Sequence, residues 1–228
     1  MKRIWLGHKL VNTRRIRLML TLLAVPALVA AFGVPSLWGA PHWQRVPAIT
    51  IVGREDDPRL PAVREAIGFW NRTFGALPTP FHLGAISRVD GTVPDADLRD
   101  LSESTIRGLR VRQHPEAFAS FGGDLIIVLS DAEFVSFTSR IGGRMLVAIK
   151  NGSTAPLNLP NVLPNVIAHE IGHALGLQHN ADPTTLMCGR PAPCRPAAFV
   201  SDEPRMFPLT SADIARLHEL YPANWKAR

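Results

Sequence analysis

The sequence predicts a mixed α/β (α+β) domain over residues 41–228. Three observations lead to this expectation: short apolar runs typical of strands, amphipathic helical patterns, and a change from strands early in the chain to helices and loops later. Because 46% of the 228 residues are apolar and 19% are charged, disorder is excluded for the bulk of the chain. Residues 41–228 are long enough for one domain and too short for two ordinary ones.

The first half of this domain contains most of the expected strands. Residues 48–52 predict a short strand, and residues 61–74 predict an amphipathic helix. A second strand is expected at residues 81–86, followed by a polar loop at residues 88–99. Residues 124–130 are too apolar for an exposed sheet face, so they predict a central strand.

The second half is expected to contain helices and a loop-rich tail. One more strand is predicted at residues 144–150, introduced by Gly142 and Gly143. A helix should begin near Pro164, because proline suits the first turn of a helix. The last clear element is a helix at residues 211–220.

The formal charge of +6 belongs to the amino-terminal segment. Residues 1–40 carry six basic side chains and no acidic one, and the other 19 basic groups are matched by 19 acidic groups. The neutral remainder lacks the positive surface that phosphate binding requires, so no nucleic-acid partner is expected. Residues 18–40 form an uncharged, mostly apolar run after the basic cluster. This predicts a signal peptide or a retained signal anchor over residues 1–40, and a secreted, periplasmic or extracellular domain that the segment tethers to the membrane if it is not cleaved.

The segment HEIGHALGLQH carries the chemistry. His169 and His173 lie one turn apart and would share one face of a helix. Gly176 can adopt the left-handed conformation that ends a helix, so the chain can return and bring His179 to the same ion. Three histidines fit one catalytic Zn²⁺ with an open position for water. Glu170 would act as the general base on that metal-bound water during hydrolysis of a peptide bond.

The alternative to a metal site is a buried helix with hydrogen-bonded histidines. That alternative is costly, because Glu170 is the one charged side chain between residues 151 and 181 and would be buried without a partner. We therefore expect a zinc-dependent endopeptidase that acts on protein or peptide substrates. A catalytically silent zinc domain of the same fold, binding peptide or polysaccharide, is the main alternative, and a metal-free membrane-anchored interaction domain is another. A monomer is expected.

This motif, followed by Thr184-Thr185-Leu186-Met187, resembles that of the metzincin zinc proteases. LPNVIAHEIGHALGLQH and PLTSADIARLHELY are similar to the active-site and carboxy-terminal helices of the matrixin branch. The resemblance implies a zincin catalytic domain with a mixed twisted sheet, an active-site helix, a methionine turn at Met187 and a carboxy-terminal helix. It also implies that Asp213 supports the methionine-turn region. The sequence departs from the family patterns at two places. Asn180 stands where matrixins commonly have Ser after the third histidine, and Met187 is not followed by a Tyr as it is in the astacin branch.

The resemblance further implies a substrate-binding strand and structural calcium. Residues 142–149 would be the sheet-edge strand that holds an extended peptide, although an internal strand is the alternative. The substrate-binding candidates in this segment are Gly143, Arg144, Met145, Leu146 and Val147. For calcium, the candidate ligands are Asp90, Asp95 and Asp97, and a solvated turn is the alternative.

The chain has two cysteines, and the first of them, Cys188, directly follows the methionine candidate. Cys188 and Cys194 are six residues apart, and the segment between them is rich in proline. In an oxidising compartment they would pair as a disulfide and brace the loop that is expected to form part of the specificity pocket. Two reduced thiols are the alternative.

Overall fold

Five strands form one sheet in the part of the chain that the computed structural model describes, residues 43–109, 116–189 and 192–228. The sheet order is β2-β1-β3-β5-β4. The strands are β1 (Ile49–Val52), β2 (Ile86–Val89), β3 (Leu125–Leu129), β4 (Phe137–Ile141) and β5 (Arg144–Ile149). All neighbours pair in parallel except β4, which is antiparallel to β5. This mixed sheet with its helices confirms the predicted fold class.

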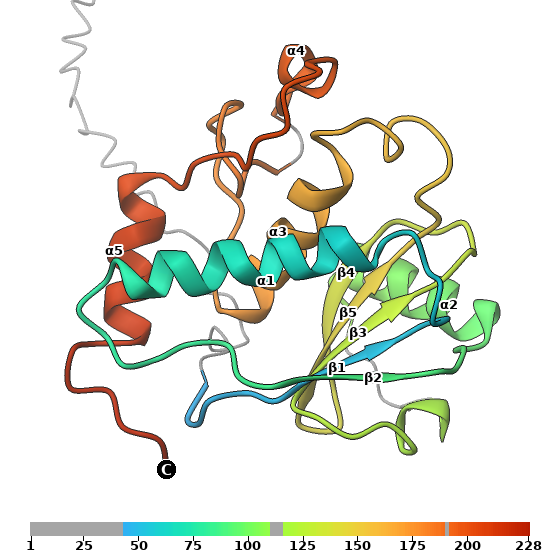
Figure 1. Ribbon diagram of the computed structural model, residues 1–228, viewed down its shortest axis with the longest axis horizontal. Coiled ribbons are helices and arrows are strands. Elements are labelled where there is room, and N and C mark those ends of the chain that lie inside the picture. Colours follow the sequence, from blue (N-terminus) through green and yellow to red (C-terminus); the bar gives the residue numbers. More distant parts are fainter. Residues whose placement is uncertain (1–42, 110–115, 190–191) are drawn as a thin grey trace, which may run out of the picture. The chain divides into compact units, whose positions relative to one another are not determined.

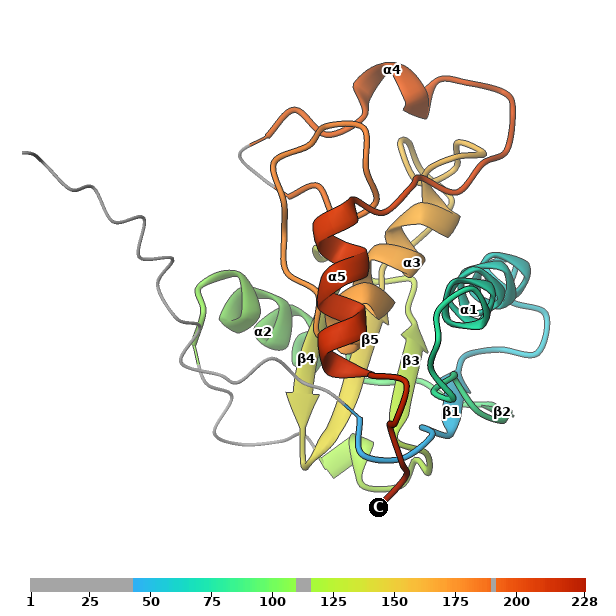
Figure 2. The same ribbon diagram turned by 90° about the vertical axis from the view of Figure 1, so that its left-hand side faces the viewer.

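Helices cover both faces of the sheet (Figures 1 and 2). On one face lie α1 (Leu60–Gly75) and α3 (Leu163–Ala174), which share a core with α5 (Ser211–Leu220). The other face is covered by α2 (Asp95–Ile106) and a short 3₁₀ helix, Glu116–Phe118, while α4 (Pro196–Phe199) is a single turn. Because strand side chains alternate between faces, neighbouring residues such as Val147 and Ala148 enter different cores.

The helix α1 holds α3 in place. Its apolar face is buried against the sheet and α3, with Val63 and Trp70 fully covered. The indole Nε1 of Trp70 donates a hydrogen bond of 2.9 Å to the main-chain carbonyl of Ala168, which lies directly before the first histidine of α3. The two helices are therefore joined by a specific polar contact as well as by apolar packing.

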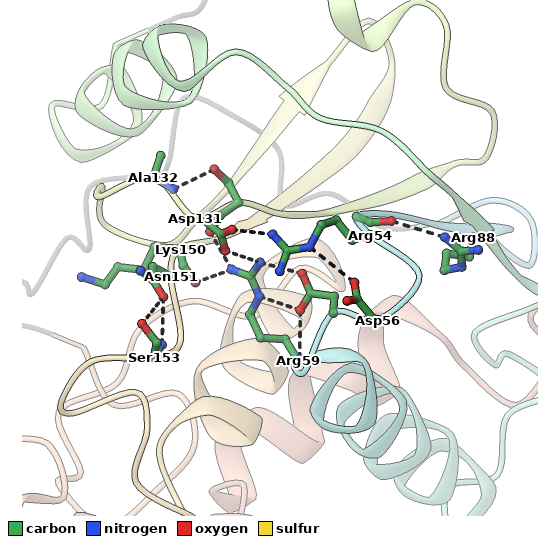
Figure 3. A network of polar contacts seen from close by, with 12 residues as sticks. Arg54, Asp56, Arg59, Arg88, Asp131, Ala132, Lys150, Asn151 and Ser153 are labelled. Carbon is green, nitrogen blue, oxygen red and sulfur yellow. Dashed lines mark hydrogen bonds and ion pairs between the residues drawn. The ribbon is translucent and has the colours of Figure 1, made fainter.

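A buried ion pair fixes the start of α1 to the sheet (Figure 3). The guanidinium of Arg59 donates to both carboxylate oxygens of Asp57, at 2.9 and 2.7 Å, and both side chains are almost fully buried. The same guanidinium donates to the main-chain carbonyls of Ser130 and Lys150, at 2.6 and 3.1 Å. Since these residues follow β3 and β5, one side chain ties α1 to the carboxyl ends of two central strands.

Three local expectations differ from the structure. The strand expected at residues 81–86 is wrong, because the main chain becomes a strand only at β2, an edge strand whose four residues are all exposed. The polar loop expected at residues 88–99 contains the start of α2, which has only two buried apolar residues, Leu98 and Leu101, and so gives a weak helical pattern. The strand β4 was not expected, because its apolar residues, Phe137 and Ile141, are separated by three polar ones.

The amino-terminal predictions are not tested by this structure. Residues 1–40, including the apolar run at 18–40, lie outside the described residues. Within the described ranges, the structure contains no helix of the length and apolarity needed to cross a membrane.

We expect Asp57→Asn to destabilise the fold in a pH-dependent way. Burial raises the pKa of Asp57, but the hydrogen bonds and charge of Arg59 outweigh this effect and hold the pKa below its ordinary value. The stabilisation is therefore present above about pH 4, the ordinary pKa of Asp, and is lost as the pH falls through the folded-state pKa. At pH 7 the variant should lose about 3 kcal/mol of unfolding free energy, because Arg59 loses its buried counter-charge and keeps only the exposed carboxylate of Asp131, 3.1 Å away.

Urea unfolding of the full chain at pH 7 and at increasingly acid pH measures this effect. Asp56→Asn is the matched control, because the Asp56 side chain is exposed and its loss should cost less than about 0.5 kcal/mol. Equal losses in the two variants, or a loss at Asp57 that does not shrink in acid, would contradict the prediction.

Candidate metal centre

The helix α3 presents two histidines because its opposite face is apolar. Ile167 and Ile171 are fully buried against the sheet and α1, and Pro164 occupies the first turn as predicted. His169 and His173 project from the other side, one turn apart. The local sequence is therefore sufficient to place these two rings together.

The end of α3 brings the third histidine back. Gly176 has a φ of +98°, the left-handed conformation that favours glycine. The main-chain N–H of Leu177 donates to the carbonyl of Gly172 at 3.0 Å, and that of Gly176 donates to the carbonyl of His173 at 3.0 Å, which together form a Schellman motif. The hydroxyl of the buried Tyr221 donates to the main-chain carbonyl of Leu175, also at the end of α3, at 3.0 Å. This reversal sends the chain back toward the exposed side of α3.

The three histidines meet through their Nε2 atoms. His169 and His179 are 3.1 Å apart, His169 and His173 are 3.1 Å apart, and His173 and His179 are 3.0 Å apart. The Nδ1 of His169 donates to the carbonyl of Leu186 at 2.8 Å, and that of His173 donates to the carbonyl of Leu177 at 2.9 Å. Because the proton of each of these rings is used at Nδ1, the Nε2 lone pair is left for a metal.

This donor set fits zinc. Nitrogens bound to a tetrahedral Zn²⁺ at about 2.0–2.1 Å lie about 3.4 Å apart, close to the observed spacing. Burial lowers the pKa of His169 to about 3 and that of His173 to about 4, so both rings are neutral at pH 7, the form that binds metal. Among the described residues, the triad is also the one group of three or more His, Cys, Asp or Glu side chains that could hold an ion. Asp90, Asp95 and Asp97 form no such group, and structural calcium stays an untested expectation.

Glu170 lies between the two helical ligands and is buried. Its carboxylate accepts a hydrogen bond of 2.8 Å from the hydroxyl of Thr138 on β4, and the same hydroxyl lies 2.6 Å from the main-chain carbonyl of Glu170. Burial raises the pKa of Glu170 to about 8, and the Thr138 hydrogen bond opposes this rise. Thr138 was missed by the sequence analysis, because no local pattern shows that β4 passes beside α3.

Met187 packs directly against α3. Its side chain is fully buried, and a Cβ added at Gly172 would lie only 2.6 Å from its sulfur and 3.0 Å from the Trp70 ring. The glycine of HEIGH, Gly172, therefore makes room for the methionine candidate. Gly189 makes room for the third histidine in the same way, since a Cβ there would lie 2.1 Å from Cγ of His179. No local pattern in the sequence marks Gly189 for this role.

The segment from His179 to Met187 is anchored to α5. The side-chain amide of Asn180 donates to Asp213 at 3.1 Å, and Asp213 also forms a capping box with Thr210 at the start of α5. The main-chain N–H of Asn180 donates to the carbonyl of Met187 at 2.9 Å. Asp213 thus supports the methionine region through Asn180, the residue that departs from the common matrixin pattern.

Cys188 and Cys194 are joined by a disulfide in the structure, as expected. Cys188 is buried, and its main chain bridges to Asn180 beside the third histidine. The disulfide therefore links the end of the methionine segment to the start of α4.

The expectation that β5 is the substrate-binding edge strand is wrong. β5 lies between β3 and β4, so the main chain of Met145, Leu146 and Val147 is paired on both sides, and their side chains are buried. Arg144 donates to the carbonyl of Phe118, and Gly143 lies in the turn before the strand. The antiparallel edge strand is β4. The Gly142-Gly143 pair is typical of a two-residue hairpin turn, so it already indicated an antiparallel strand before β5.

Comparison with known families supports the resemblance. Residues 129–222 match the model of the peptidase family described as Matrixin. The matched segment runs from the end of β3 through α5 and includes the three histidines, Glu170 and Met187. This match confirms the resemblance predicted from the motif for that part of the chain. No protein among the curated sequences matches the chain.

Several solved structures have a similar arrangement at low identity. An archaemetzincin from Methanopyrus kandleri is 16% identical with a TM-score of 0.47, and the match covers 79% of this chain and 97% of that one. Metalloproteinase-II from Bacteroides fragilis is 15% identical with a TM-score of 0.44 over 79% of this chain and 54% of that one. A zinc-dependent peptidase from Methanocorpusculum labreanum is 16% identical with a TM-score of 0.36 over 74% and 99%.

We expect Gly172→Ala to destabilise the protein by about 1–3 kcal/mol, because the added methyl group would overlap the Met187 sulfur and the Trp70 ring. Thermal and urea unfolding measure the loss. Gly68→Ala is the control within α1, where the new Cβ would meet only the end of the Arg72 side chain, and it should be neutral or stabilising by up to about 1 kcal/mol. A neutral Gly172→Ala would show that Met187 does not pack against α3 as described.

Proposed function

We propose that this chain, whose matrixin-like segment and histidine triad support a zinc metallopeptidase, is an endopeptidase that uses Glu170 as its general base. The observation that carries the proposal is the convergence of three histidine Nε2 atoms within 3.1 Å of one another. The buried Glu170 carboxylate comes from α3, the helix that also carries His169 and His173. Three nitrogen ligands leave a fourth position open for water or substrate, as in catalytic zinc sites.

The roles follow from the chemistry of the groups. Zinc, when bound, lowers the pKa of a water molecule and polarises a carbonyl oxygen. Glu170 would accept a proton from the attacking water and deliver it to the leaving nitrogen. The pKa of Glu170 would fall toward neutrality beside a divalent cation, because an opposite charge favours the carboxylate. A carboxyl whose pKa lies near neutrality can both accept and return a proton.

The open edge of β4 supports binding of an extended peptide. Gly142 and Gly143 have φ values of +55° and +82°, so Ile141 and Arg144 flank a two-residue turn and form a hydrogen-bonded pair. Because hydrogen-bonded and non-bonded pairs alternate along an antiparallel ladder, Thr138 and Arg140 direct their main-chain N–H and C=O groups away from β5. A substrate strand could pair with these groups and pass directly beside Glu170. This arrangement suits cleavage within a chain.

The compartment is also part of the proposal. The Cys188–Cys194 disulfide fits an oxidising environment, which agrees with the expectation that residues 41–228 act on the far side of a membrane. The substrate is then a protein segment that can become extended, because pairing with β4 requires an unfolded strand.

The central test is Glu170→Gln in the full chain. Zinc content should stay near one ion per chain in both wild type and variant, because Glu170 does not contribute to the triad. Cleavage of an unfolded protein should fall by about 10²–10⁴-fold, the usual contribution of a positioned acid–base group. A wild type that binds zinc but cleaves nothing in a broad peptide library would instead support a silent peptide- or polysaccharide-binding domain.

Thr138→Val tests whether the hydroxyl positions the base. The substitution keeps the side-chain shape and removes the donor to Glu170, so we expect kcat to fall about tenfold or more with little change in KM. Thr138→Ser retains the hydroxyl and should recover most of kcat. If valine and serine behave alike, the hydrogen bond has no part in the reaction.

A further inference from the structure

One carbonyl oxygen connects the histidine triad to an arginine outside it. The main-chain oxygen of Leu186 accepts from Nδ1 of His169 at 2.8 Å and from Nη1 of Arg195 at 2.8 Å. The same Nη1 donates to the carbonyl of Thr185 at 2.7 Å. A carbonyl oxygen has two lone pairs, so both donors can be satisfied at once.

Arg195 is held in an unusual conformation. Its φ of +55° and ψ of +29° lie in the left-handed region, where it is the one non-glycine residue with positive φ among the described residues. This conformation costs about 1 kcal/mol or more for a residue with a Cβ. Its main-chain N–H donates to the carbonyl of Pro183 at 2.8 Å, and the disulfide of the preceding Cys194 fastens the same place to Cys188. Glycine would relieve the strain but would lose the guanidinium.

The guanidinium of Arg195 has no acidic partner in the described ranges of the chain. It lies 5.0 Å from the ring centre of Phe207 and 5.7 Å from that of Phe199. Its Nε is buried and makes no hydrogen bond. A cation in this setting is compensated by its aromatic neighbours and by charge-assisted hydrogen bonds to main-chain carbonyls, of which that of Leu186 is one.

We propose that Arg195 is a positioning residue for the metal centre, acting on His169 through the carbonyl of Leu186. By holding this carbonyl, Arg195 fixes the plane of the His169 ring and keeps the ring proton on Nδ1, so that Nε2 faces the other two histidines. The proposal rests on the metal-binding part of the proposed function and does not require proteolysis.

His173 provides an internal contrast. Its Nδ1 donates to the carbonyl of Leu177, and the N–H of Leu177 is bonded within the Schellman turn at the end of α3. The turn that supports His173 is therefore held by its own main-chain hydrogen bonds and by the Tyr221 hydroxyl on the Leu175 carbonyl, and Arg195 takes no part in it. The carbonyl of Leu186 lies in a loop, and the N–H of Leu186 is bonded to the carbonyl of Pro208. Removing the Arg195 side chain should therefore loosen His169 and leave His173 unchanged.

The experiment compares three variants of the full chain. Arg195→Met removes the donors and keeps an apolar stem for packing on Phe207. Arg195→Lys keeps a charged donor. Arg205→Met is the matched control, because the Arg205 guanidinium also lies over the Phe207 ring, at 5.7 Å, but donates to neither Thr185 nor Leu186.

Zinc affinity is measured by competition with a chelator at a temperature where circular dichroism shows every variant to be folded. We expect Arg195→Met to bind zinc about 10–100-fold more weakly than wild type, the usual effect of losing an outer support of a metal ligand. Arg195→Lys should recover part of this loss, and Arg205→Met should stay within about twofold of wild type.

The histidine tautomers of the zinc-free chain give a second readout, measured by ¹⁵N–¹H NMR. In Arg195→Met, His169 should lose its single Nδ1–H form while His173 keeps it. If Arg195→Met lowers the melting temperature but has wild-type zinc affinity and tautomers, Arg195 only stabilises the loop and the proposal is overturned. A wild type that binds one zinc but cleaves no peptide would contradict the endopeptidase alone, whereas one that binds no zinc would overturn both proposals.

Discussion

Three imidazole Nε2 atoms have to meet within about 3 Å of one another, and an α-helix can supply only two of them. The third must come from chain that leaves the helix and returns at once. Gly176 makes that return possible through its left-handed conformation, and Tyr221 satisfies a carbonyl at the helix end that the reversal exposes. The placement of His179, the packing of Met187 and the anchoring of Asn180 to α5 all depend on this one reversal.

The site is supported by elements that are far apart in the sequence. Glu170 is contacted from the edge strand by Thr138, and His169 is oriented by a loop carbonyl that Arg195 also holds. The helix itself is positioned from α1, through Trp70. Buried Arg59 then fixes the start of α1 to the carboxyl ends of β3 and β5. Two of the histidines and Glu170 therefore lie on one helix, but the geometry of the site is set by contacts from several directions.

Some strands of the sheet could be predicted from the sequence, but their order could not. Each of β3 and β5 is apolar enough to be recognised alone, and the prediction of a central strand at residues 124–130 agrees with the position of β3. The order of strands is not a local property, so β5 was expected at the edge while β4 occupies it. Likewise, α2 has only a narrow apolar stripe, and its helical state is stabilised by packing on the sheet rather than by its own pattern.

The sequence by itself determined the candidate ligand set, because two histidines one helical turn apart, a helix-ending glycine and a third histidine act over eleven consecutive residues. It also determined the mixed α/β class, since apolar runs and helical patterns are local. Only the tertiary structure decided which strand has a free edge, that Thr138 reaches Glu170, and that Arg195 shares a carbonyl with His169. These contacts join residues between 9 and 32 positions apart through folded loops and strand order, and no periodicity in the chain records them.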